Sequence, residues 1–289
     1  MEQNTLKGIS IYAFAAFFVI CMTAFGKALG DLGYHPIEIV FYRSFGGLIL
    51  ISAYIIVFKK YDVLKTSRPL AHLGRSALGN TGIALWFWAV SILPLSTATS
   101  ISYIAPIIVT AFSALLLKEK VGRYKWGAVL FAFCGTLFLI QPSDINASQL
   151  GLTIAIVNAF IVAGISITLR SLGKSERALT TTFYFLLFGT IATGLILPFV
   201  WTSSPELGWL LFGLILTGFI NQPMKTYAFR IASASSISPV QYLGVVWATI
   251  IGYIFWEDIP TTNVIIGCAI VVSSNFIIIW REKTAKGKS

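Results

Sequence analysis

The sequence predicts an all-α polytopic membrane protein in which ten transmembrane helices form two inverted five-helix repeats. Three observations predict this class: the composition, the spacing of the apolar segments and the distribution of basic residues. Of the 289 residues, 56% are hydrophobic and only 11% are charged, and the mean hydropathy is +0.82. A water-soluble globule of this length does not have such a composition. We therefore expect residues 1–289 to form a single membrane domain.

Hydropathy divides the chain into ten apolar segments, each near the ~20 residues that a helix needs to cross the hydrocarbon core. These segments are residues 8–29, 36–58, 74–93, 96–117, 124–141, 149–169, 178–201, 207–229, 233–256 and 262–280. The first segment follows Lys7, as the apolar region of a signal peptide follows a basic residue. It is longer than a typical region of that kind, so we interpret it as a retained helix. Ten crossings place both termini on the same side.

The basic residues predict the orientation of these helices. With a cytoplasmic N-terminus, 18 of the 21 Lys and Arg residues lie in inner connections or at the termini. They are Lys7, Lys59, Lys60, Lys65, Arg68, Arg75, Lys118, Lys120, Arg123, Lys125, Arg170, Lys174, Arg177, Arg230, Arg281, Lys283, Lys286 and Lys288. The charges of the outer connections are all acidic: Asp31, Glu38, Asp144, Glu206, Glu257 and Asp258. This pattern predicts a multi-pass protein of the cell (inner) membrane with both termini in the cytoplasm.

The net charge of +10 has a membrane explanation as well. It is spread over short loops that orient helices and meet anionic lipid headgroups, so we expect no nucleic-acid partner. The three cysteines lie in separate apolar segments without metal-ligand spacing, so no metal site, disulfide or cofactor is indicated. A small-molecule substrate and the lipid bilayer are the expected partners. A homodimer is also compatible with the sequence.

An internal repeat divides the chain into residues 8–141 and 149–280. Residues 97–102 of the fourth segment are similar to residues 233–238 of the ninth, and Glu119 at the end of the fourth corresponds to Glu257. Each half has five helices, an odd number, so the second copy enters the membrane from the opposite side. Inverted repeats are frequent in secondary transporters, where two halves expose one central site to either side in turn.

Three prolines inside predicted helices are candidate hinges, because proline removes a backbone hydrogen bond from a helix. They are Pro106, Pro223 and Pro239. Proline is also common in membrane helices that have no hinge. For each of the three residues, the alternative is therefore a proline without a role in movement.

The stretch from Trp86 to Pro106 combines an aromatic helix end, a turn at Pro94 and a helix of small residues with a mid-span proline. Together with the closing Glu119, it resembles the signature of the drug/metabolite transporter superfamily, EamA type. Further residues fit the same pattern: Lys27, Pro36, Arg43, Tyr227, Arg230, Pro239 and Glu257. The resemblance implies a ten-helix carrier of small organic molecules. Members carry amino acids, S-adenosylmethionine, riboflavin, metallophores, sugars or drugs, and residues 65–69 with His72 look most like S-adenosylmethionine uptake carriers.

Three cations inside predicted helices are candidates for binding a substrate anion: Lys27, Arg43 and Lys225. A charge in the bilayer costs at least ~2.5 kcal/mol, so it usually faces a watery cavity or a ligand of opposite charge. Lys27 and Lys225 lie near enough to helix ends to reach the interface instead. Arg43 lies seven residues past Pro36, about 10 Å along a helix, and is therefore the strongest candidate.

Polar and aromatic residues complete the expected site. The amides Asn221 and Gln222 stand directly before Pro223, where freed backbone carbonyls also bind polar groups. Other candidates are Asn80, Thr99, Tyr103, Asn158, Gln241 and Tyr242, with the aromatic residues Trp86, Tyr227 and Trp247. Such a set suits an amphipathic organic molecule with a planar group and a carboxylate. Packing against other helices or lipid is the alternative for each.

These observations favour a secondary transporter that moves an amino-acid-like or S-adenosylmethionine-like metabolite by alternating access. A broad exporter of drugs, metabolites or metallophores is the alternative within transport. A membrane enzyme is less consistent, since His35 and His72 are the only histidines and no HExxH or GxSxG motif occurs. A lipid-handling scaffold is also compatible with the sequence.

Overall fold

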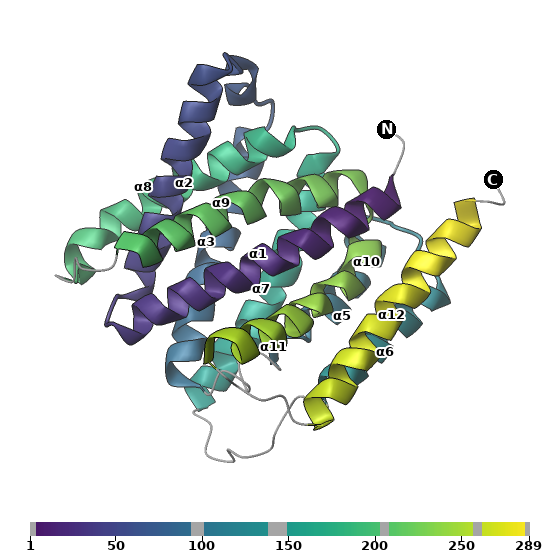
Figure 1. Cartoon of the computed structure of the whole chain (residues 1–289). Coiled ribbons are helices and arrows are strands. Elements are labelled where there is room, and N and C mark those ends of the chain that lie inside the picture. The colour runs from purple at the N-terminus through teal and green to yellow at the C-terminus, as the bar shows by residue number, and fades with distance from the viewer. Residues whose placement is uncertain (1–3, 94–100, 138–148, 203–207, 257–261, 287–289) are drawn as a thin grey trace.

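The computed structural model describes residues 4–93, 101–137, 149–202, 208–256 and 262–286, and helices make up its regular structure in these ranges (Figure 1). The first half contains α1 (Thr5–Asp31), α2 (Pro36–Val57), the 3₁₀ turn η1 (Tyr61–Leu64), α3 (Pro69–Ile92), α5 (Ala105–Leu116) and α6 (Arg123–Leu137). The second half contains α7 (Gln149–Gly173), α8 (Ala178–Val200), α9 (Gly208–Ile231), α10 (Ala234–Ile237), the 3₁₀ segment η2 (Ser238–Tyr242), α11 (Leu243–Trp256) and α12 (Thr262–Lys286). The predicted all-α class is confirmed.

Local sequence signals set the starts of the long helices. Asn4 caps α1 by accepting a hydrogen bond from the Lys7 amide at 3.3 Å. Pro36 and Pro69 each occupy the first turn of a helix, where the missing N–H has no helical partner to lose. The boundaries of α1 and α2 therefore lie within a few residues of those expected from hydropathy.

The ninth predicted segment is divided, although its hydropathy predicts one continuous helix. Ser233 caps α10 by accepting a hydrogen bond from the Ser236 amide at 3.2 Å, and Pro239 lies at the start of η2. Proline cannot donate to the preceding turn, which explains why the backbone tightens here. α5 also has a proline, Pro106, in its first turn. Residues 97–100 of the repeat motif, including Thr99, lie outside the described residues.

Helices pair between the two halves of the chain (Figure 1). α1 packs along α9 and α3 packs along α7, while α2 packs against α8 and α6 against α12. Suppose that each helix is replaced by its counterpart in the other half, so that α1 exchanges with α7 and α3 exchanges with α9. The first two pairs then interchange, and the last two map onto themselves. Two inverted copies would give the same set of pairs.

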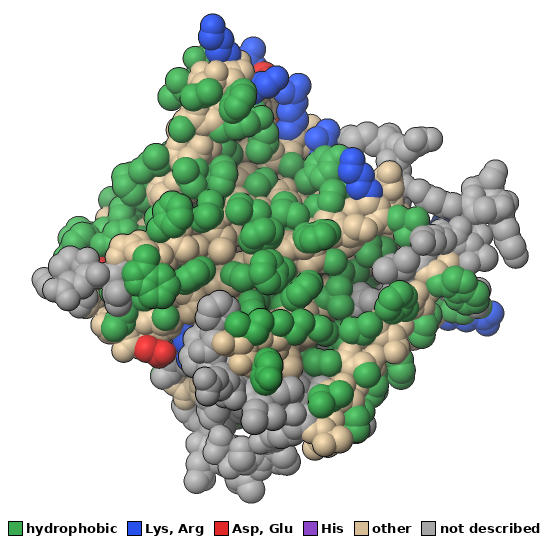
Figure 2. Space-filling view, viewed as in Figure 1, with side chains coloured by type: hydrophobic (Ala, Val, Ile, Leu, Met, Phe, Trp, Pro, Cys, Tyr) green, Lys and Arg blue, Asp and Glu red, His purple; other side chains and the backbone are tan. Residues whose placement is uncertain are grey.

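Large apolar side chains cover the visible outer surface (Figure 2). Phe199 is 86% exposed and Leu195 73% exposed, on the same helix. Contiguous apolar surface of this kind needs lipid or another protein to cover it. Five described stretches are long and apolar enough to cross a membrane, namely α1, α2, α7, α8 and residues Ala234–Ile251. Lys and Arg side chains gather at the upper and right-hand edge of Figure 2, the end at which α1 begins and α12 ends.

The connection between α2 and α3 is fastened to the corner between α7 and α8. Glu176 accepts hydrogen bonds from the Thr66 hydroxyl at 3.0 Å and from the Ser67 amide and hydroxyl at 3.2 and 3.1 Å. His72 places Nε2 3.7 Å from the same carboxylate and stacks on Tyr184. His72 is buried because α3 begins before it and carries it under the loop. The residues that look like those of S-adenosylmethionine carriers thus hold a loop in place.

The charge of Glu176 predicts a pH-dependent contribution to stability. Burial opposes ionisation of this carboxyl, but hydrogen bonds from Thr66 and Ser67 outweigh burial and hold its pKa below the ordinary value. The contribution is therefore present above the ordinary Glu pKa of about 4.3 and is lost as the pH falls through the lowered value.

We expect Glu176→Gln to lower the melting temperature of the detergent-purified protein at pH 7, with a loss of ~1–3 kcal/mol. The difference in melting temperature between the variant and the wild type should decrease as the pH drops below about 4. The exposed Asp31→Asn serves as the control and should show no such difference. Equal melting temperatures of Glu176→Gln and the wild type at pH 7 would contradict the assignment.

Candidate functional site

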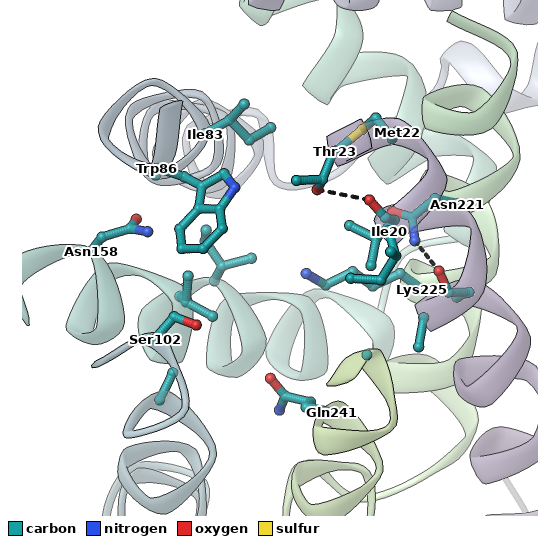
Figure 3. A pocket seen from close by; sticks show the side chains of 18 of the residues that line it. Ile20, Met22, Thr23, Ile83, Trp86, Ser102, Asn158, Asn221, Lys225 and Gln241 are labelled. Carbon is teal, nitrogen blue, oxygen red and sulfur yellow. Dashed lines mark hydrogen bonds between the residues drawn. The ribbon is translucent and has the colours of Figure 1, made fainter. Parts of the chain in front are cut away.

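A cavity of about 260 Å³ lies between α1, α3, α7, α9 and the interrupted helices α5 and η2–α11 (Figure 3). Most of its wall is apolar, with a few polar groups among aliphatic and aromatic side chains. Its polar lining consists of Tyr12, Thr23, Ser102, Tyr103, Asn158, Asn221, Lys225 and Gln241. Small-molecule sites have this composition, with volumes from ~300 Å³ upward. The described conformation therefore has room for a compact molecule or for part of a larger one.

Lys225 supplies the positive charge of the cavity. Its side chain extends from α9 with the ammonium toward the centre, facing the side from which Trp86 projects (Figure 3). No carboxylate of the described residues lies within 4 Å of this ammonium. An ammonium at an apolar wall gains free energy from an anionic ligand, because water is scarce there and no protein anion compensates the charge.

The opposite wall combines an indole ring with amides. Trp86 lies on α3 and Asn158 on α7, and Gln241 approaches from η2 (Figure 3). Asn158 Oδ1 and Gln241 Nε2 are buried without a hydrogen-bond partner in the described part of the chain. Leaving such an atom unpaired costs ~1–3 kcal/mol, so a ligand or water in the cavity would stabilise both. Asn221 differs, because its amide donates to the Ala15 carbonyl at 2.6 Å and joins α9 to α1.

The two interrupted helices meet beside the cavity. The Tyr242 hydroxyl donates to the Tyr103 carbonyl at 2.9 Å, so Tyr242 is buried in this junction and does not line the cavity. The Thr110 hydroxyl donates to Ser238 Oγ at 2.9 Å, and Ser238 donates in turn to the Pro106 carbonyl. Side chains of η2 thus bind backbone carbonyls around Pro106, which allows irregular backbone to line a cavity.

Arg43 lies behind the cavity wall and is only 2% exposed. Its Nε donates to Met22 Sδ at 3.1 Å, and its Nη2 donates to Gln222 Oε1 at 3.3 Å. Its guanidinium carbon also lies 5.3 Å from the centre of the Phe185 ring. Arg43 and Gln222 therefore form one buried pair that joins α2 to α9.

Sequence reasoning missed Arg75, which it assigned to a cytoplasmic connection. α3 begins at Pro69, five residues before the predicted segment, so Arg75 lies in the second turn of the helix instead of at its end, and it is 2% exposed. Its guanidinium carbon lies 4.5 Å from the centre of the Phe185 ring, the ring that Arg43 also contacts. Gly79, one turn later on α3, is the sequence signal that indicates room for the arginine side chain.

The remaining predicted residues lie elsewhere. Lys27 is exposed on α1 and does not line the cavity. Asn80 is buried and donates to the Ser76 carbonyl at 2.9 Å. Tyr227 lines a separate surface pocket, and Trp247 packs edge-on against Phe17, 5.1 Å between ring centres. Of the candidate hinges, Pro106 lines the cavity, whereas Pro223 lies inside the continuous α9.

A charged cluster joins the ends of several helices at the side where the described chain begins and ends. The Glu119 carboxylate accepts from Arg170 Nε at 3.0 Å and from the amides of Ala234 and Ser235, each at 3.3 Å. Arg170 also donates through Nη1 to the carbonyls of Phe229 and Arg230, at 3.2 and 3.0 Å. The cluster therefore links the end of α5 with α7, α9 and α10.

The chain matches the model of the EamA-like transporter family twice, over residues 6–141 and 149–280. A pseudopaline exporter of Pseudomonas aeruginosa is 27% identical over 99% of this chain and 100% of its own length. An S-adenosylmethionine uptake transporter of Rickettsia prowazekii is 27% identical over 86% of this chain and 84% of its own. An uncharacterised transporter of Helicobacter pylori is 28% identical over 96% of each chain.

A solved crystal structure supports the fold. It superposes with a TM-score of 0.75 over 93% of this chain and 95% of the other, at 17% sequence identity. The resemblance inferred from the sequence and the predicted ten-helix membrane architecture are both confirmed. The chain belongs to the EamA-like transporter family, and it is a multi-pass membrane transporter of small metabolites.

Proposed function

We propose that this transporter carries an amphipathic metabolite with a carboxylate and a planar group across the cytoplasmic membrane by alternating access. The position of Lys225 is the observation that supports this most. Its ammonium enters an apolar cavity without an acidic partner among the described residues, and an indole ring stands across from it. A ligand carboxylate would pair with the ammonium, and a planar group would stack on Trp86.

The relatives support the same substrate class. S-adenosylmethionine has an α-carboxylate that would pair with the Lys225 ammonium, and a sulfonium and a purine ring that would lie against the indole, with its own cationic groups directed away from Lys225. One named relative is an uptake transporter and another an exporter, and the direction of transport in this chain is therefore a separate question. A broad exporter is the second candidate, and the mostly apolar cavity wall favours it. In either case the chain acts as a carrier, not an enzyme.

Three features together support alternating access. Pairs of helices interchange when the halves are exchanged, as expected for inverted repeats over residues 8–141 and 149–280. Pro106 lies in the first turn of α5 and Pro239 at the start of η2, and these two elements meet beside the cavity. The Glu119–Arg170 cluster ties helix ends together on the side that we assign to the cytoplasm, with both termini. We infer that this cluster closes the inner side in the described conformation.

The first prediction about transport and substrate binding concerns the cavity cation. Lys225→Met should lower uptake or efflux of a carboxylate substrate in reconstituted vesicles about ten-fold or more, because a charge-assisted hydrogen bond is worth ~1.5–3 kcal/mol. The matched control is Lys27→Met, which removes an exposed membrane cation outside the cavity and should transport normally. Equal transport by the Lys225 variant and the wild type, at equal membrane insertion, would exclude Lys225 from substrate binding.

The second prediction concerns the aromatic wall. Trp86→Ala should weaken binding of a substrate with a planar group by about two- to ten-fold, and Trp86→Phe should weaken it less. Trp88 is 46% exposed on the same helix and does not line the cavity, so Trp88→Ala should bind like the wild type. Isothermal titration calorimetry of the purified protein measures each affinity. A larger loss in Trp88→Ala than in Trp86→Ala would place the stacking surface elsewhere.

The third prediction concerns the inner cluster. Glu119→Gln leaves the buried Arg170 without its anion, a change that costs ~3–5 kcal/mol in comparable buried pairs. The inner side should then open more often, and a cysteine introduced by Gln241→Cys should react several-fold faster with a reagent supplied from the cytoplasmic face. Lys120→Gln, at an exposed neighbouring residue, is the control. Unchanged reactivity in Glu119→Gln would show that the cluster does not close the cavity.

A further inference from the structure

Two buried arginines have hydrogen-bond donors that no described residue satisfies. These donors are Nη1 of Arg43 and Nε and Nη1 of Arg75, and Nε2 of the neighbouring Gln222 is also unpaired. Both arginines are 2% exposed and Gln222 is 4% exposed, so bulk water does not replace the missing partners. An unpaired guanidinium donor in a low-dielectric interior is costly, and several around one aromatic ring indicate a missing acceptor.

The surrounding residues make room for the guanidinium groups. A Cβ added to Gly79 would lie 2.6 Å from the Phe185 ring and closer still to Arg75 Nη1. A Cβ added to Gly218 would lie 3.1 Å from Arg43 Nε. A side chain at Gly79 would therefore displace the Phe185 ring and Arg75 Nη1, and one at Gly218 would require a small shift of Arg43. Phe185 stands within cation–π distance of both guanidinium groups.

The local charge is strongly unbalanced. Arg43 and Arg75 contact the same Phe185 ring, and Lys225 lies one turn after Gln222, the α9 residue that Arg43 contacts, so the three cations are neighbours. No carboxylate of the described residues lies within 4 Å of any of the three. Like charges in a membrane interior repel strongly, and an anion is the partner that lowers this repulsion and accepts the unused hydrogen bonds.

We infer that Arg43 and Arg75, with the Gln222 amide, bind a small anion at a subsite behind the substrate cavity, separate from the Lys225 ammonium. The ligand class is a compact monovalent anion, such as chloride or a carboxylate group. A carboxylate accepts two parallel N–H bonds from a guanidinium, and a halide accepts single bonds from each of several donors. Two sources have this chemistry: free chloride and a second carboxylate of the transported molecule.

The test measures anion binding without any transport substrate. Full-length protein is purified in sodium gluconate, and chloride or formate replaces gluconate at constant sodium concentration. Each anion should raise the melting temperature by several degrees as its concentration increases, because it binds the folded state. Arg43→Gln and Arg75→Gln should each need at least a ten-fold higher anion concentration for the same rise in melting temperature. Arg68→Gln, an exposed change at the start of the same helix as Arg75, should show the same rise in melting temperature as the wild type.

A second measurement covers arginine variants that fail to fold. Equilibrium dialysis of radiolabelled chloride, or of radiolabelled formate, against Lys225→Met should still show about one bound anion per chain, because the cavity ammonium is not part of this subsite. Binding of formate alone identifies a substrate carboxylate as the source, and competition between chloride and formate identifies a site open to free halide. Absence of binding for both anions overturns the inference. A shift that survives in both arginine variants overturns it as well. The result does not depend on the proposed substrate, since Lys225→Met separates the two sites.

Discussion

The constraint on which this structure depends is that a polar group in a membrane must find its partner inside the protein. The long helices satisfy their own backbone groups, which is why apolar side chains alone can cover their outer faces. At the start of α5, the Tyr103 and Pro106 carbonyls accept hydrogen bonds from the Tyr242 and Ser238 side chains of η2. Irregular backbone is therefore found in the interior, next to the cavity. The same constraint explains why the unpaired donors of the arginine pair point to a ligand.

The cavity gains its chemistry from this arrangement. Helices α1, α3, α7 and α9 form walls that are mostly apolar, and the polar groups come from these helices, from η2 and from the residues just before α5. Asn221 illustrates the difference between a structural amide and a binding amide. Its amide is already bonded to the Ala15 carbonyl, whereas Asn158 and Gln241 keep an unpaired atom at the cavity. Candidate ligand contacts are therefore distinguished by unused hydrogen-bonding capacity, not by polarity alone.

The sequence predicted the helices well, and the site only in part. Hydropathy identifies a segment because lipid contact demands apolar residues over its whole length, so the number and order of helices follow from composition. It averages over a window, however, and does not show which face of a helix a residue occupies. Lys225 and Trp86 were correctly placed in membrane helices, yet only the packing shows that both face one cavity. Arg75 was missed because a basic residue near a helix start has the same pattern as a loop residue.

The three cations lie on different helices: Lys225 on α9, Arg43 on α2 and Arg75 on α3. This placement affects how a carrier of this kind distinguishes its empty and loaded states. With the site empty, Lys225, Arg43 and Arg75 repel one another without a neutralising carboxylate among the described residues. A bound anion removes part of this repulsion and so stabilises the conformation in which the three charges lie close together. Movement of α9 relative to α2 and α3 would separate Lys225 from the arginines and relieve the repulsion in the empty carrier. Ligand charge, not shape alone, would then bias the equilibrium between the two orientations of the halves.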